Sequence, residues 1–155
     1  MKHLLLPVLF MLCSMGLSAQ SFEELKEIEL ASAEDYKQAE GHVKAASNYM
    51  LSQPITDENR QQRLYAINFI MRWMEGTPDY KFNLGKNFSD YCGNNIDLSS
   101  LYLSAMAKTA VENPVLAKNE EEIITRAEAV FLNYCAQKEN KAPRNRAIKK
   151  ALKNR

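Results

Sequence analysis

Residues 32–54 read SAEDYKQAEGHVKAASNYMLSQP, and this stretch decides the class of fold. Its apolar residues recur at alternating steps of three and four, at Tyr36, Ala39, Val43, Ala46 and Met50. That spacing places them on one face of an α-helix. Ser32 followed by Asp35 is typical of a capping box at a helix start, and Pro54 ends the pattern. The stretch predicts an amphipathic helix over 33–52.

The next predicted helix has apolar residues around much of its circumference. Thr56 or Asp57 is its candidate N-cap, and Gly76 is expected in the C′ position, with Pro78 just beyond. Its core face is expected to contain Leu64, Ile67, Ile70, Met71 and Met74, and to be widened by Tyr65, Phe69 and Trp73. Because a helix with apolar residues on most sides is usually buried, we predict that this helix is central.

Two more long helices are predicted in the C-terminal half. Asp97 is the expected cap of the first, which stops before Pro114. Asn119 begins the second, and three glutamates follow it in the first turn, where the helix dipole favours acids. The segment between, residues 77–96, is predicted to be an extended loop held by its aromatics, with a short helix around 86–92.

The four predicted helices indicate an all-α fold. We expect a single helical bundle of four main helices plus short terminal helices. The alternative is a stack of two helical hairpins, 33–75 and 97–138, resembling tetratricopeptide units, although the residue pattern of that repeat is not reproduced in register in both hairpins.

The first 19 residues have the pattern of a secretory signal peptide. A positively charged start precedes the uncharged apolar stretch 4–16, and Ala19 precedes the polar Gln20. Cleavage is expected after Ala19. It would leave a helical domain over 20–137 and a basic tail over 138–155, without a transmembrane span. The expected location is periplasmic or secreted.

The formal charge of +1 conceals an asymmetry. Residues 138–155 contain eight bases and one acid, a net charge of +7, whereas residues 20–137 contain eleven bases and eighteen acids, a net charge of −7. We expect the tail to be helical, with a thin apolar stripe at Ile148 and Leu152. The candidate anion-binding residues are Arg144, Arg146, Lys149, Lys150, Lys153 and Arg155.

Lipid head groups or an acidic polymer are the partners that such a tail would suit. Nucleic acid is disfavoured, because no aromatic residue interleaves with the bases for stacking. The alternative is a solvated, frayed terminus that rests on the acidic body.

Two further groups of residues are candidates for a function. Cys92 and Cys135 remain after the leader is removed, and an oxidising envelope permits a disulfide between them; the alternative is two buried free thiols. Four aromatics also lie close together in the sequence: Tyr80, Phe82, Phe88 and Tyr91. They would line a groove for a peptide or a glycan, or they would instead seal the end of the bundle.

The residues needed for familiar enzyme chemistry are scarce. His42 is the single histidine after the leader, and the sequence contains no HExxH, CxxC, GxSxG or phosphate-binding glycine motif. The acidic clusters lie in first helical turns, where they compensate the helix dipole. No catalytic residue, metal or cofactor is therefore predicted, and an unfamiliar hydrolase is a disfavoured alternative.

The stretch Leu64–Tyr80, together with Leu101–Met106 and the LSAQ that ends the leader, resembles small exported all-helical proteins of Bacteroidota-type bacteria. This resemblance implies an envelope or secreted location and brings no assigned activity. The sequence thus predicts a non-enzymatic binding or structural module of the cell envelope. Its partner would be an envelope protein or polymer, and the sequence indicates no oligomeric state.

Overall fold

Helices account for all the regular structure in the residues that the computed structural model describes, 21–116 and 118–155. The α-helices are α1 (Ala33–Ser52), α2 (Arg60–Gly76), α3 (Phe88–Cys92), α4 (Ile96–Glu112), α5 (Glu120–Ala136) and α6 (Arg146–Lys153). Short 3-10 helices are η1 (Glu23–Glu27), η2 (Pro114–Leu116) and η3 (Lys138–Asn140). The all-α prediction is confirmed. The predicted signal peptide, residues 1–19, lies outside the described residues.

The predicted first helix has the expected bounds and the expected cap. The Ser32 hydroxyl accepts a hydrogen bond from the backbone N–H of Asp35 at 3.3 Å, and the Asp35 carboxylate accepts one from the backbone N–H of Ser32 at 2.8 Å. The Ser32 hydroxyl and the backbone N–H groups of Ser32 and Ala31 all donate to the Asp35 carboxylate, and these bonds hold the pKa of that carboxyl below its ordinary value. The helix ends at Ser52, shortly before Pro54. Local sequence signals therefore set both ends of α1.

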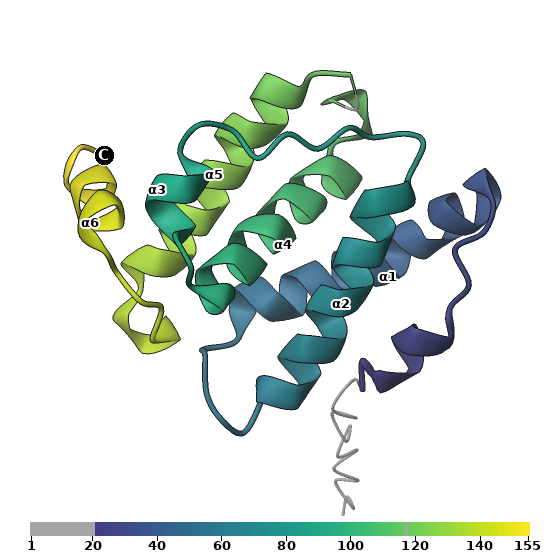
Figure 1. Cartoon of the computed structure of the whole chain (residues 1–155), viewed down its shortest axis with the longest axis horizontal. Coiled ribbons are helices and arrows are strands. Elements are labelled where there is room, and N and C mark those ends of the chain that lie inside the picture. Colours follow the sequence, from purple (N-terminus) through teal and green to yellow (C-terminus); the bar gives the residue numbers. More distant parts are fainter. Residues whose placement is uncertain (1–20, 117) are drawn as a thin grey trace, which may run out of the picture.

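The central helix is α4, not α2 as predicted. It packs against α1, α2, α3 and α5, and it lies between α2 and α5 (Figure 1). Its buried residues lie on several sides of the helix and include large and small side chains: Leu98, Leu101, Tyr102, Ser104, Ala105, Met106, Ala107, Thr109 and Ala110. The small side chains let neighbouring helices approach closely. Since α1 also packs on α2, the four long helices form one bundle.

Two residues of the predicted core face of α2 lie outside the core. Leu64 and Met71 are exposed over 49% and 40% of their surface, whereas Phe69, Ile70 and Trp73 are buried as expected. The large aromatic side chains bury more apolar surface than Leu64 and Met71 would, so they decide which face turns inward. The indole N–H of Trp73 also donates a 3.0 Å hydrogen bond to the carbonyl of Tyr36 on α1.

Asparagines, rather than the predicted residues, act at the starts of α2 and α4. The Asn95 side chain accepts a hydrogen bond from the N–H of Leu98 at 2.9 Å, so Asn95 and not Asp97 caps α4. Neither Thr56 nor Asp57 caps α2, which begins after Asn59. The Asn59 side chain instead closes the preceding turn with a 2.7 Å bond to the carbonyl of Pro54. By contrast, the predicted Asn119 cap of α5 is confirmed.

Gly76 is the last residue of α2 and not a left-handed C′ residue. The backbone continues in an extended conformation at Thr77. A Cβ added to Gly76 would clash with the ring and hydroxyl of Tyr36, so the glycine leaves room for that side chain and is not there for its backbone freedom.

The segment between α2 and α4 is the predicted extended loop with a short helix, α3. The rings of Tyr80 and Phe82 pack on Trp73, with centroid distances of 5.5 and 5.9 Å. The hydroxyl of Tyr102 on α4 donates a 3.0 Å bond to the carbonyl of Leu84. These contacts hold the loop against the bundle.

Two adjacent residues of α2 test which face is the core. Ile70→Ala should lower the free energy of unfolding by about 2–5 kcal/mol, because Ile70 is buried and its truncation leaves a cavity. Met71→Ala should cost less than about 1 kcal/mol, because Met71 is exposed. Urea denaturation of both variants measures the difference. Equal losses would contradict the exposure of Met71.

Candidate functional site

The basic tail is a docked helix and not a frayed terminus. The Ile148 side chain of α6 is fully buried. The Asn145 side chain caps α6 by accepting a 3.0 Å bond from the N–H of Ile148, and its amide donates to the carbonyls of Asp90 and Tyr91, both at 2.9 Å. At the C-terminal end, Arg155 donates to the Asn133 side chain on α5 at 3.0 Å. The tail helix is therefore fixed at both ends.

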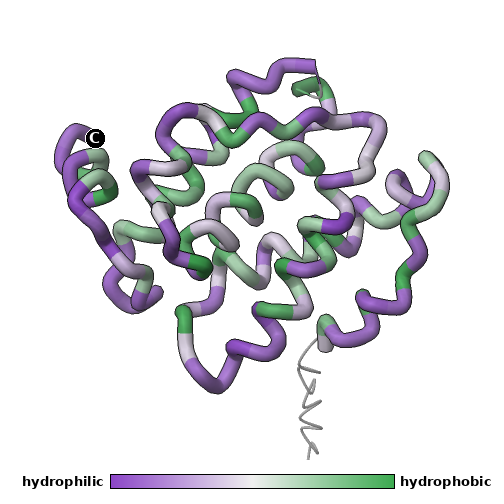
Figure 2. Tube along the Cα trace, viewed as in Figure 1, coloured by the Kyte–Doolittle hydropathy of each residue, from purple (hydrophilic) through white to green (hydrophobic). Residues whose placement is uncertain are grey.

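The basic side chains of the tail point to solvent. Arg144 is half-buried, and the other five candidate anion-binding residues, Arg146, Lys149, Lys150, Lys153 and Arg155, are exposed. Ion pairs among the described residues involve only other bases, from Lys26 to Arg126. In Figure 2 α6 is mostly hydrophilic, with short hydrophobic stretches between the hydrophilic ones. We call Arg146, Lys149, Lys150 and Lys153 the basic face of α6.

The four candidate groove aromatics lie mostly in the core. Tyr80 is buried, and the Tyr91 ring stacks on Phe131 with a centroid distance of 5.8 Å. Phe82 and Phe88 are half-buried, and Phe88 meets Tyr102 edge to face at 5.2 Å. These contacts fit the interpretation that the aromatics seal the bundle.

The predicted disulfide is absent from the structure. Cys92 and Cys135 are free and buried. Burial raises the pKa of Cys92 to about 11 and that of Cys135 to about 12. The thiols therefore stay protonated near neutral pH, and neither is an activated nucleophile.

His42 and the acidic residues do not assemble into a site. His42 is exposed on α1, with its ring at the edge of Phe69, 6.3 Å between centroids. Among residues 21–116 and 118–155, no three potential metal ligands of the His, Cys, Asp and Glu types lie together.

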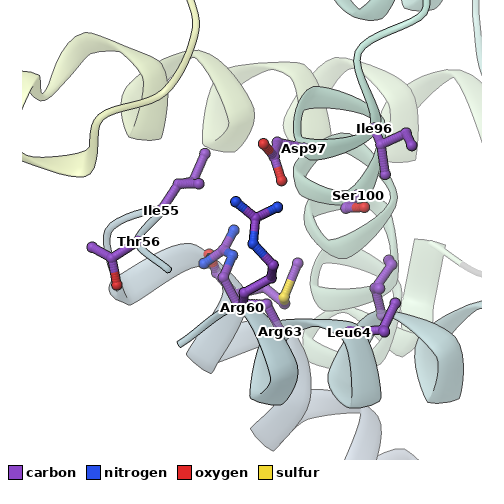
Figure 3. A pocket seen from close by; sticks show the side chains of 10 residues that line it. Ile55, Thr56, Arg60, Arg63, Leu64, Ile96, Asp97 and Ser100 are labelled. Atoms are coloured by element: carbon purple, nitrogen blue, oxygen red, sulfur yellow. The ribbon is translucent and has the colours of Figure 1, made fainter. Parts of the chain in front are cut away.

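A cavity that the sequence did not predict lies between the α1–α2 loop, α2 and the first turn of α4. Its volume is about 250 Å³. Apolar residues form much of its wall, namely Met50, Ile55, Leu64, Ile67 and Ile96. The polar residues are Thr56, Arg60, Arg63, Asp97 and Ser100. The arginines and Asp97 come together in it from two different helices (Figure 3). We call it the arginine pocket.

Arg63 is the unusual residue of the arginine pocket. It is only 6% exposed, although a guanidinium remains charged at any ordinary pH. Its Nη1 donates to the carbonyls of Met50 and Gln53, at 3.1 and 3.2 Å, at the C-terminal end of α1, where positive charge is favourable. Its Nη2 is buried and has no hydrogen-bond partner.

The loop beside Arg63 is held by α5 and the residues that follow it. The Tyr134 hydroxyl donates a 2.7 Å bond to the carbonyl of Gln53, and the carbonyl of Asn140 accepts a 3.0 Å bond from the N–H of Ile55. Burial raises the pKa of Tyr134, and the nearby Arg63 guanidinium opposes that shift. The loop wall of the pocket is therefore anchored at Gln53 and at Ile55.

One sequence signal could have revealed this site. Arg63 lies three residues before Ala66 and seven before Ile70, so it falls on the core stripe of α2, where a charged residue needs partners. Those partners are carbonyls at the end of another helix, which no local pattern specifies.

The chain matches no protein-family model, no curated protein and no solved structure. Its function must therefore be inferred from its own residues.

The cysteines give a direct chemical test of the structure. Iodoacetamide at pH 8 should leave native Cys92 and Cys135 unmodified, because both thiols are buried and protonated. In guanidinium chloride without reductant, both should be alkylated, as peptide mass spectrometry can show. A chain that needs reductant before it reacts would contain the disulfide and would contradict the structure.

Proposed function

We propose that the protein is an exported, non-enzymatic binding module of the cell envelope, and that the basic face of α6 binds its anionic partner. The observation that carries this proposal is a rigidly docked helix whose exposed bases form no ion pair among the described residues. Unpaired bases that share one helix attract phosphate or carboxylate groups through their summed field.

The interaction would be electrostatic and superficial. Two large apolar side chains lie on the α6 stripe. Leu152 is half-buried, and Ile148 is buried against the protein. Ile148 is therefore not free to insert into a bilayer, so the binding would rely on charge alone. Such binding weakens as salt screens the charges.

The residues that could carry enzyme chemistry are poorly placed for it in the part of the chain that the structure describes. His42 is exposed on α1, and no hydrogen bond or ion pair joins it to an acid among the described residues. The raised thiol pKa values disfavour cysteine chemistry at Cys92 and Cys135. An unfamiliar hydrolase stays the disfavoured alternative.

Neutralising the basic face tests the proposal. We predict that the fourfold variant Arg146→Gln, Lys149→Gln, Lys150→Gln and Lys153→Gln binds vesicles containing phosphatidylglycerol at least about 100-fold more weakly than the unmodified protein, since each base near an anionic surface contributes about 1 kcal/mol. Co-sedimentation measures the loss. A parallel arm with polygalacturonate distinguishes phosphate head groups from an acidic polymer.

The matched control removes four bases that already have acidic partners: Lys26→Gln, Lys37→Gln, Lys44→Gln and Arg126→Gln. Its net charge equals that of the tail variant, and it should bind within about threefold of the unmodified protein. If both variants lose binding equally, net charge and not the basic face is responsible. If neither probe is retained by the unmodified protein, the proposal is wrong.

Export is the part of the proposal that rests on the leader alone. Its composition predicts cleavage after Ala19, so the protein recovered from the native envelope or medium should begin at Gln20. Intact mass spectrometry measures the terminus. A cytoplasmic protein that retains Met1 would contradict export.

A further inference from the structure

We propose that the arginine pocket binds a free α-amino acid with an aliphatic side chain, whose carboxylate contacts Arg60 and whose ammonium group contacts Asp97. This site is separate from the basic face of α6, and the inference stands or falls independently of the proposed function.

The charges that a ligand can reach in the arginine pocket are those of Arg60 and Asp97. Arg63 is buried, its Nη1 binds two carbonyls of α1 and its Nη2 is buried as well, so its guanidinium lies behind the wall. Arg60 is the exposed first residue of α2, and Asp97, in the first turn of α4, is half-buried. In Figure 3 the Asp97 carboxylate points from α4 toward the arginine side chains of α2. The cavity thus offers one cation and one anion, on two different helices.

Arg60 and Asp97 lie near each other without forming an ion pair. Asp97 has no ion-pair partner within 4 Å among the described residues. The hydrogen bond to Asp57 raises the pKa of Arg60, and the more distant charge of Asp97 raises it further. Two opposite charges that interact through space but do not touch leave room for a ligand that carries both signs.

A zwitterion is the ligand that satisfies both charges. Arg60 donates from Nη2 to Asp57 at 2.7 Å, and the other N–H groups of its guanidinium stay available for a ligand carboxylate. The Asp97 carboxylate can accept a bond from an ammonium group. A simple acid would leave Asp97 unpaired and a simple amine would be repelled by Arg60, whereas an α-amino acid carries both groups on one carbon and can contact both residues.

The apolar wall selects the side chain of the same ligand. Met50 and Ile67 are buried, and Leu64 and Ile96 form an exposed rim. Ile96 is 80% exposed in the first turn of α4, so a hydrocarbon group in the cavity would remove part of its apolar surface from water. A volume of about 250 Å³ lies below the usual range of ligand pockets, so the cavity suits one short side chain and no larger body.

Three compounds that share one branched hydrocarbon group test the chemistry. Leucine, titrated into the ¹⁵N-labelled protein, should shift amide signals of residues 55–67 and 96–100 and saturate. Isocaproate is leucine without the ammonium group and isoamylamine is leucine without the carboxylate, so each should bind at least about tenfold more weakly, because each loses one charged contact. No saturable shift with leucine, or either analogue binding as tightly as leucine, would overturn the proposal.

Two further probes test the side chain and the source of the ligand. Glycine keeps both charges without the hydrocarbon group, so it should bind at least about fivefold more weakly than leucine. The peptide Leu-Gly-Gly-Gly keeps the ammonium group and the side chain but carries its carboxylate far from them, so it should bind at least about tenfold more weakly. Glycine binding as tightly as leucine would refute the apolar selection. Equal binding of the peptide would show that the site takes a chain terminus, and it would overturn the proposal of a free amino acid.

Two variants test which residue contacts which charge. Arg60→Gln should reduce the preference for leucine over isoamylamine from at least about tenfold to less than about threefold, since the ligand carboxylate loses its partner. Asp97→Asn should do the same to the preference for leucine over isocaproate, since the ammonium group loses its partner. A loss of folded protein would lower both affinities together and leave these preferences unchanged. Unchanged preferences would therefore overturn the proposal.

Matched controls are available on α5. Arg126 forms a 2.7 Å ion pair with Glu122, as Arg60 does with Asp57, and Glu121 lies in the first turn of its helix, as Asp97 does. Arg126→Gln and Glu121→Gln make the same changes of charge at positions that do not line the arginine pocket, and they should leave leucine binding within about twofold. Controls that weaken leucine binding as much as Arg60→Gln and Asp97→Asn would refute binding in this cavity.

Discussion

Close packing around α4 sets the positions of the other long helices. Buried side chains lie on several sides of α4, and small residues such as Ala105, Ala107 and Ala110 let α1, α2 and α5 approach it. A helix that buries this much of its surface must be covered on all those sides, and no single neighbour can do so. Because α1 and α2 also pack on each other, the loop between them comes to lie beside the first turn of α4. The arginine pocket forms at that junction, so its position follows from the core.

The helix α5 connects this core to both candidate binding surfaces. Its Tyr134 hydroxyl holds the end of α1 by donating to the carbonyl of Gln53, which also accepts a bond from Arg63. The chain then continues from α5 through η3 into the tail, where Ile148 and Asn145 fix α6 against the protein. The arginine pocket therefore has a rigid loop wall, and the basic face of α6 has a fixed orientation. Both surfaces are preorganised, which lowers the entropy cost of binding.

Local sequence signals predicted the helices well and the core less well. The capping box at Ser32, the cap at Asn119 and the prolines depend on neighbours in the sequence, and the structure confirms the elements that they delimit. The prediction that α2 is the central helix is wrong because it counted large apolar residues, of which α2 has more. Many of the buried residues of α4 are small, and small residues make a helix central by letting its neighbours pack closely against it. The arginine pocket could not be predicted, since the partners of Arg63 belong to the far end of α1.

Hydrogen exchange measured residue by residue tests the central claim, that one core built around α4 holds α6 in place. The account predicts the slowest exchange in the middle of α4, around 101–110, where opening requires global unfolding. It also predicts measurable protection of α6, because Ile148 is buried and Asn145 caps the helix. Amides of α6 that exchange as fast as an unstructured chain, or amides of α2 that outlast those of α4, would contradict it.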